Sequence, residues 1–229
     1  PVETALEYRR AAPRGTGGRG NIMTDDDINA RANEKAAKKK AARDKMLATK
    51  TIEKGLLIVH TGKGKGKSTA AFGLAARAVG NGMRVGVVQY VKGKWETGER
   101  VVLEKFPDQV TIRTMGEGFT WETQDRARDI RAAEAAWEVS KEMIEASRGP
   151  DPAYHMVILD ELNIVLRYDY LPLDAVLETL ANKPTDLHVV VTGRNAKAPL
   201  IELADLVTEM TQVKHPLRSG VKAQKGIEF

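Results

Sequence analysis

Residues 56–69 read Leu-Leu-Ile-Val-His-Thr-Gly-Lys-Gly-Lys-Gly-Lys-Ser-Thr, an apolar run followed at once by a loop rich in glycine and lysine. The apolar run is typical of a buried strand, and residues 70–79 continue the loop with a helical pattern. Glycines allow a backbone to turn several N–H groups toward one anion, and a helix N-terminus adds the positive end of its dipole. A strand, a glycine-rich loop and a helix in this order predict a phosphate loop that binds a nucleoside triphosphate.

The loop departs from the usual pattern G-x-x-x-x-G-K-[ST] by one residue. Thr61 holds the first position, and the glycine follows as Gly62. Lys67 is expected to reach the outer phosphates, and the Ser68 hydroxyl is expected to ligate Mg²⁺. The alternative is a merely flexible turn, in which the three lysines of the loop would repel one another with no anion to neutralise them. The expected nucleotide-binding residues of the loop are Thr61, Gly62, Lys63, Gly64, Lys65, Gly66, Lys67, Ser68 and Thr69.

A second acidic element ends another apolar run. Residues 157–161 read Val-Ile-Leu-Asp-Glu, a strand pattern that stops at two carboxylates. In phosphate-loop proteins such a strand places a carboxylate near the Mg²⁺ held by the loop. Asp also follows strands simply as a helix cap, but the presence of the loop favours Asp160 and Glu161 as metal ligands.

From residue 55 onward, apolar runs alternate with amphipathic stretches. This alternation predicts an α/β fold with a mostly parallel open sheet of about six strands and helices on both faces, of the P-loop NTPase-like (RecA-like) kind. Ligands of such sheets bind at the carboxyl ends of the strands, where the glycine-rich loop falls. The strand candidates are 56–60, 84–91, 110–114, 156–159, 187–192 and 206–210, and the helix candidates are 68–79, 98–105, 124–147, 173–182 and 198–204.

Charge is distributed unevenly along the 229 residues. Residues 1–50 hold 12 Lys and Arg against 7 Asp and Glu, whereas residues 51–229 hold 24 of each. The neutral remainder argues against a face that tracks nucleic acid. The chain has no cysteine, which excludes disulfides and thiolate metal sites. No apolar run approaches the ~18 residues of a spanning helix, so we expect no membrane association. Residues 1–22 lack the apolar region of a secretory signal, and a cytoplasmic location is expected.

The chain is expected to divide into three parts. Residues 1–22 contain a glycine-rich stretch without an apolar core and are expected to be a disordered leader or an artefact. Residues 23–54 form a basic segment with strong helix propensity, and residues 55–229 form the catalytic domain. The basic segment is either a solvated helix or a covering element for a ligand or a partner subunit.

A loop at residues 115–121 carries two aromatic residues in a chain with only 5% aromatics. Phe119 and Trp121 are either core packing or apolar rings that a mobile loop presents to a flat ligand. Polar groups at two further strand ends, 192–194 and 213–216, could also face the site.

These motifs resemble the phosphate-loop type of ATP:corrinoid adenosyltransferase of cobalamin biosynthesis and salvage. The resemblance covers about residues 28–229, and the loop's Thr-Gly start is shared with that family. Departures are small: Lys63 stands where Asn is common, and Ser68 stands where Thr is common. The segments that carry the resemblance are Thr61–Gly73, Arg77–Gly80, Val85–Gln89, Gly118–Trp121, Leu159–Leu162, Tyr168–Leu173, Thr192–Arg194, Val213–His215 and Gly220–Ile227.

The resemblance implies transfer of the 5′-deoxyadenosyl group of ATP to the Co(I) centre of a corrinoid, with triphosphate as the leaving group. It implies further nucleotide contacts at Arg77, Arg194 and His215. It gives Phe119 and Trp121 the role of crowding the lower cobalt face, which eases reduction of Co(II) by a flavin or flavoprotein. It also implies a homodimer in which the N-terminal helix covers the site.

The residues alone leave other functions open. A phosphate loop and two carboxylates favour attack at the γ-phosphate, so a phosphate-loop ATPase acting as a motor or switch, with a basic N-terminal arm, is the alternative function. A non-catalytic nucleotide-binding module is a third. In the adenosyltransferase the nucleophile is the cobalt, so the protein must position C5′ and stabilise the leaving group.

Overall fold

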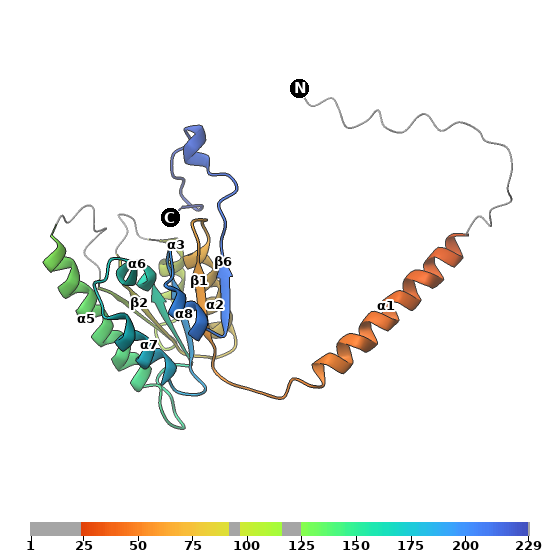
Figure 1. Ribbon diagram of the computed structural model, residues 1–229, viewed down its shortest axis with the longest axis horizontal. Coiled ribbons are helices and arrows are strands. Elements are labelled where there is room, and N and C mark those ends of the chain that lie inside the picture. The colour runs from red at the N-terminus through yellow and green to blue at the C-terminus, as the bar shows by residue number, and fades with distance from the viewer. Residues whose placement is uncertain (1–23, 92–96, 116–124, 229) are drawn as a thin grey trace. The chain divides into compact units, whose positions relative to one another are not determined.

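The computed structural model describes residues 24–91, 97–115 and 125–228. The chain forms two units, residues 1–52 and residues 53–229 (Figure 1). None of the described helices combines the length and the apolar character that crossing a bilayer requires.

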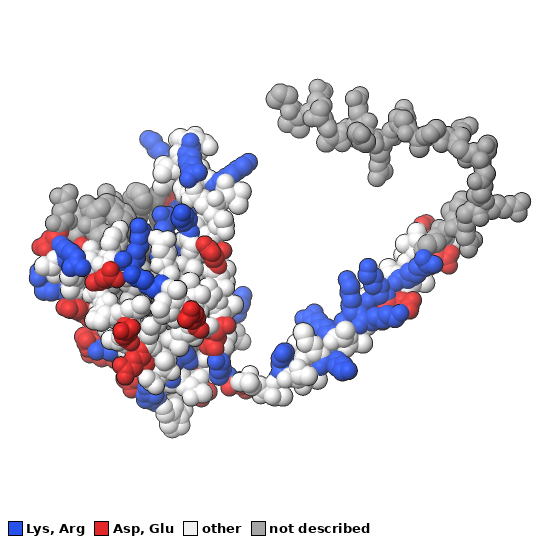
Figure 2. All heavy atoms as spheres, in the orientation of Figure 1, with Lys and Arg blue, Asp and Glu red and all other residues white. Residues whose placement is uncertain are grey.

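The first unit contains one long helix, α1 (Asp25–Leu47). Thr24 begins it with a capping box, because its hydroxyl accepts from the Asp27 backbone N–H while the Asp27 carboxylate accepts from the Thr24 backbone N–H. No residue of α1 is buried within its own unit, and Figure 2 shows Lys and Arg side chains gathered along it. The helix therefore derives its stability from local propensity and capping rather than from packing.

The second unit is built on one six-stranded sheet in the order β3-β2-β4-β5-β1-β6. Every neighbouring pair of these strands is parallel, which confirms the predicted α/β fold. The strands are β1 (Leu57–Thr61), β2 (Val85–Gln89), β3 (Val110–Thr114), β4 (Met156–Asp160), β5 (His188–Thr192) and β6 (Leu206–Glu209). One strand, β5, lies between the strand that precedes the loop and the strand that ends in the two carboxylates.

Helices cover both faces of the sheet (Figure 1). On one face, α2 packs small and aromatic side chains, among them Ala71 and Phe72, against Ile58 and Val87 of the sheet. On the other face lies the larger core, in which Trp137 is buried. The helices are α2 (Lys67–Gly80) and α3 (Gly98–Leu103) on the first face, and α5 (Arg126–Glu145), α6 (Leu162–Arg167), α7 (Leu173–Ala181) and α8 (Ala198–Leu203) on the second, with a 3₁₀ helix at Pro216–Ser219.

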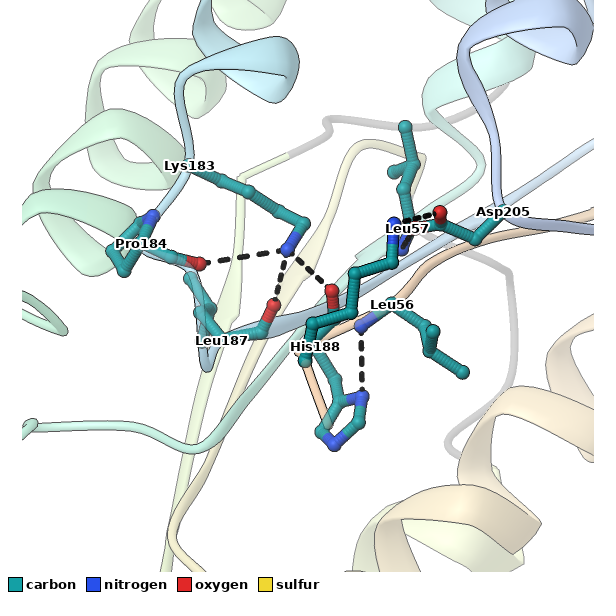
Figure 3. Close-up of polar contacts among 9 residues, drawn as sticks. Leu56, Leu57, Lys183, Pro184, Leu187, His188 and Asp205 are labelled. Carbon is teal, nitrogen blue, oxygen red and sulfur yellow. Dashed lines mark hydrogen bonds and ion pairs between the residues drawn. The ribbon is translucent and has the colours of Figure 1, made fainter. Parts of the chain in front are cut away.

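Polar contacts fix the amino ends of the central strands (Figure 3). The Lys183 ammonium donates to the backbone carbonyls of Gly55, at 2.7 Å, and Leu187, at 2.8 Å. The Asp205 carboxylate accepts from the Leu57 backbone N–H at 2.9 Å. These contacts set where β1 enters the sheet, and so they also set where its carboxyl end delivers the glycine-rich loop.

Candidate functional site

The glycine-rich loop connects β1 to α2 and needs its glycines for two reasons. Gly62 and Gly66 have φ angles of 98° and 102°, a left-handed region that side chains disfavour. A Cβ on Gly62 would also lie 2.5 Å from the Met210 carbonyl oxygen, and one on Gly64 would lie 2.7 Å from the same atom. The loop therefore packs against the backbone that follows β6 too closely for any side chain at these positions.

The threonine that replaces the usual first glycine has a structural reason. Thr61 is the last residue of β1, and its hydroxyl accepts from the Ala196 backbone N–H at 3.0 Å. Its carbonyl accepts from the Met210 N–H at 2.8 Å, and the Met210 carbonyl in turn accepts from the Gly64 N–H at 2.7 Å. Thr61 thus ties the start of the loop to the segments after β5 and β6.

Lys67 is the first residue of α2, and its side chain is nearly enclosed, with a relative exposure of 6%. Its ammonium donates to the Gly64 carbonyl at 2.6 Å. Burial lowers the pKa of Lys67, the Glu161 carboxylate raises it, and the charges of Arg194 and Lys65 lower it. A desolvated ammonium at a helix N-terminus, beside two further cations, is an environment that favours a bound anion.

The structure brings the second acidic element to the same place. Asp160 ends β4, is 5% exposed, and accepts from the Thr192 hydroxyl at 2.7 Å. Burial raises the pKa of Asp160, while hydrogen bonds from Thr192, Ser68 and Gln89 lower it. The contact with Ser68 joins the predicted metal ligand of the loop to the carboxylate strand.

Glu161 follows Asp160 in the left-handed backbone region, with a φ of 65°. Burial and, to a smaller extent, the Asp160 carboxylate raise the pKa of Glu161, while Lys67 and Arg194 lower it, and the net result is a pKa of about 7. Its Oε2 atom is buried and has no hydrogen-bond partner among the described residues. An ionisable oxygen left without a partner beside a phosphate loop has the chemistry of a ligand for a hard cation.

This donor set fits Mg²⁺ in particular. Among the described residues no group of three or more His, Cys, Asp or Glu is placed to hold a metal. Mg²⁺ does not need such a cage, because it is commonly bound by one or two carboxylates together with substrate phosphates and water. Ser68, Asp160 and Glu161, together with a triphosphate, would make up a donor set of this kind.

The remaining predicted residues are placed differently. Arg194 lies near the site, since its charge acts on both Lys67 and Glu161. Arg77 is exposed on the last turn of α2, ten residues or about 15 Å along the helix from Lys67, so the structure does not bring it to the loop. His215 caps the 3₁₀ helix by accepting from the Leu217 N–H at 3.2 Å. Lys63 and Thr69 are exposed, and Phe119 and Trp121 lie outside the described residues.

One contact at the loop was not foreseen from the sequence. The Lys65 ammonium forms an ion pair with the Glu228 carboxylate. Figure 1 shows that the C-terminal segment after β6 lies beyond the carboxyl ends of the strands, which explains how Glu228 reaches the loop. No periodic pattern in this segment could have indicated the contact, because it joins residues that are 163 positions apart.

A glycine-rich loop at the N-terminus of α2, a buried lysine and two facing carboxylates define a phosphate-loop nucleotide-binding protein. Comparison with known families then identifies the group. The chain belongs to the ATP:corrinoid adenosyltransferase family BtuR/CobO/CobP, whose sequence profile matches residues 53–229. The family and the implied class of enzyme, a transferase, agree with the sequence prediction, and the comparisons give no support to the motor or switch alternative.

Three curated relatives each match more than four fifths of the chain. A corrinoid adenosyltransferase from Sinorhizobium sp is 58% identical over 93% of this chain and 97% of its own length. One from Pseudomonas aeruginosa is 53% identical over 87% and 96%. The corrinoid adenosyltransferase CobA of Salmonella typhimurium is 48% identical over 81% and 91%. Among solved structures, the RadB recombinase matches with 14% identity and a TM-score of 0.42, over 71% of this chain and 77% of that one.

Proposed function

We propose that this protein transfers the 5′-deoxyadenosyl group of ATP to the Co(I) centre of a corrinoid and releases triphosphate, in the biosynthesis or salvage of adenosylcobalamin. The observation that carries the proposal is that buried Lys67 lies near the Glu161 carboxylate at the carboxyl ends of the central strands, in a chain of the adenosyltransferase family.

The reaction is a displacement at the ribose C5′. The Co(I) substrate supplies the electron pair of the new Co–C5′ bond and becomes Co(III), and the C5′–O bond breaks with its electron pair going to triphosphate. The protein therefore has two tasks, which are to hold C5′ in line with the cobalt and to stabilise the charge of the leaving group. Neither task requires a nucleophilic side chain.

Lys67 and the N-terminus of α2 stabilise the leaving group. The Lys67 ammonium is largely shielded from solvent, so water weakens its interaction with the developing charge on triphosphate less than it would for an exposed lysine. The electrostatic reach of Arg194 to Lys67 and Glu161 supports a role for its guanidinium at the phosphates or the ribose. Arg77 and His215 remain predicted contacts to other parts of the nucleotide.

Ser68, Glu161 and Asp160 would hold Mg²⁺. The metal, when bound with ATP, would neutralise part of the triphosphate charge and fix the phosphate chain in one geometry. Ser68 and Glu161 supply oxygen ligands, and Asp160 holds the Ser68 hydroxyl through the hydrogen bond between them.

Three further parts of the proposal concern the corrinoid and the assembly. Phe119 and Trp121 crowd the lower cobalt face, which displaces the axial ligand and eases the reduction of Co(II) by a flavin or flavoprotein. Helix α1, which is basic and has no buried face of its own, covers the active site, and the enzyme is a homodimer. We also propose that the enzyme works in the cytoplasm.

Product analysis tests the proposed reaction against the ATPase alternative. Phosphorus NMR of a mixture of enzyme, ATP, Mg²⁺ and chemically reduced cobalamin is expected to show triphosphate formed in proportion to the alkylated corrinoid. ADP and orthophosphate, formed equally with and without the corrinoid, would instead identify a γ-phosphate hydrolase.

A further inference from the structure

The strand between the loop strand and the carboxylate strand ends in a residue with an unusual set of contacts. Thr192 is the last residue of β5 and is completely buried. Its hydroxyl donates to Asp160 Oδ1 at 2.7 Å and accepts from the Glu161 backbone N–H at 2.9 Å. One hydroxyl thus contacts both residues that carry the carboxylates of the site.

The direction of these two bonds matters. A hydroxyl has one proton, and in Thr192 that proton is directed at the Asp160 carboxylate, which leaves the oxygen lone pairs to receive the Glu161 N–H. The first bond is one of three side-chain hydrogen bonds to the Asp160 carboxylate, the other two coming from Ser68 and Gln89. The second bond holds the left-handed backbone of Glu161, whose φ of 65° is costly for a non-glycine residue.

The neighbouring residue makes the arrangement rigid. Gly193 has a φ of 125°, and a Cβ there would lie 2.8 Å from Asn163 Cβ and 3.0 Å from Glu161 Oε2. The Gly193 carbonyl accepts from the Asn163 amide at 3.1 Å, and its N–H donates to the His60 carbonyl of β1 at 3.2 Å. The end of β5 is therefore bonded to Asn163 on one side and to β1 on the other, and the missing side chain of Gly193 leaves room for the Glu161 carboxylate.

We propose that Thr192 is a positioning residue for the metal site, acting through Asp160 and Glu161. Its hydroxyl fixes the Asp160 carboxylate, which holds the Ser68 hydroxyl, and it also fixes the backbone of Glu161. Ser68 and Glu161 are thereby placed to bind Mg²⁺ together with the triphosphate on the loop. This inference rests on the proposed function, because it assigns the orientation of ligands that the proposed function names.

The test separates metal binding from nucleotide binding. The affinity of the full-length protein for ATP is measured by titration calorimetry in EDTA and in saturating Mg²⁺, and the ratio of the two affinities gives the metal contribution. Loss of a partner that orients a metal ligand typically lowers metal affinity 10–100-fold. Thr192→Val, which keeps the shape and removes the hydroxyl, is expected to reduce the ratio by about tenfold or more. Its affinity in EDTA is expected to stay near that of the unmodified protein.

Two further variants distinguish this role from a general packing role. Thr192→Ser keeps the hydroxyl and is expected to retain the ratio. Ser147→Ala removes another buried hydroxyl, which donates to the Met143 carbonyl at 2.8 Å within α5, and is expected to leave the ratio unchanged. The inference is overturned if Thr192→Val keeps the full ratio, if it loses affinity equally in EDTA and Mg²⁺, or if Thr192→Ser loses the ratio while melting normally.

Glu161→Gln separates failure of this inference from failure of the proposed function. If Glu161→Gln lowers the ratio and Thr192→Val does not, the carboxylate binds the metal and only the role of Thr192 is wrong. If Glu161→Gln keeps the ratio of the unmodified protein, the metal site of the proposed function is wrong, and the inference about Thr192 is wrong with it.

Discussion

The pKa of Glu161 makes a quantitative prediction about stability. Glu161 has a folded-state pKa of about 7 against an ordinary value of 4.5. At about 1.4 kcal/mol per pKa unit, this difference corresponds to about 3 kcal/mol. Because the folded-state pKa is raised, the folded protein binds more protons than the unfolded chain between these two values. The free energy of unfolding in the absence of ligand should therefore fall as pH rises from about 4.5 to about 7 and then level off.

Glu161→Gln removes this titration and keeps the shape of the side chain. The variant should therefore be more stable than the unmodified protein at about pH 8 by about 3 kcal/mol, relative to the difference between them at about pH 4.5. Urea unfolding in EDTA, followed by tryptophan fluorescence, measures both proteins at the two pH values, with Trp137 buried in the core as a reporter. Taking the difference between the two proteins cancels the titration of the other groups that they share.

A matched substitution and a ligand complete the test. Glu202→Gln removes an exposed carboxylate of α8 and should follow the unmodified protein at both pH values. Saturating Mg²⁺ and ATP should reverse the order of stability, because the bound metal requires the ionised carboxylate. If the unmodified protein and Glu161→Gln show the same pH dependence in EDTA, then Glu161 does not have the desolvated environment described here.

Three other predictions concern catalysis. Lys67→Ala should lower turnover on the order of 100-fold or more, because it removes a contact to the leaving group. Its melting temperature should stay close to normal, because the lost ammonium was buried away from water. Near-normal rates would show that Lys67 does not belong to the site. Deleting residues 1–22 should leave corrinoid turnover unchanged, whereas deleting residues 1–50 should impair it. Full activity of the longer deletion would show that α1 has no part in catalysis. Replacing Phe119 or Trp121 with Ala should slow turnover strongly when a flavin donor must reduce Co(II), and much less when Co(I) is supplied chemically. Equal losses in the two assays, with a lowered melting temperature, would instead indicate core packing, because truncating a buried aromatic ring costs roughly 3–5 kcal/mol of stability.

The elements with strong patterns could be predicted from the sequence. All six strands were predicted, and the four central ones were the clearest, because parallel strands buried on both faces read as continuous apolar runs such as Val189–Val191. Helix α6 was missed, since it has only six residues and follows directly on the carboxylate pair. Its short length offers too few turns for a helical periodicity to be recognised.

The site was only partly accessible from sequence. The loop motif and the strand ending in Asp160 were recognised, because each rests on a local pattern of a few residues. The function of Thr192 as a partner of Asp160 depends on strand order, which places β5 between β1 and β4. The close approach of Met210 to the glycines depends on where β6 joins the sheet. Both are tertiary contacts between distant segments, and no local pattern encodes them.

The most direct test of the proposed function follows the carbon atom of ATP that moves. ATP labelled with ¹³C at C5′ is incubated with the enzyme, Mg²⁺ and chemically reduced cobalamin, and the corrinoid is examined by NMR and by its visible spectrum. The proposed displacement predicts that the labelled carbon becomes bonded to cobalt and that the corrinoid shows the spectrum of an alkylcorrinoid. The same product should form far more slowly with Lys67→Ala. A label that remains in ADP, with an unaltered corrinoid spectrum, would contradict adenosyl transfer by this protein.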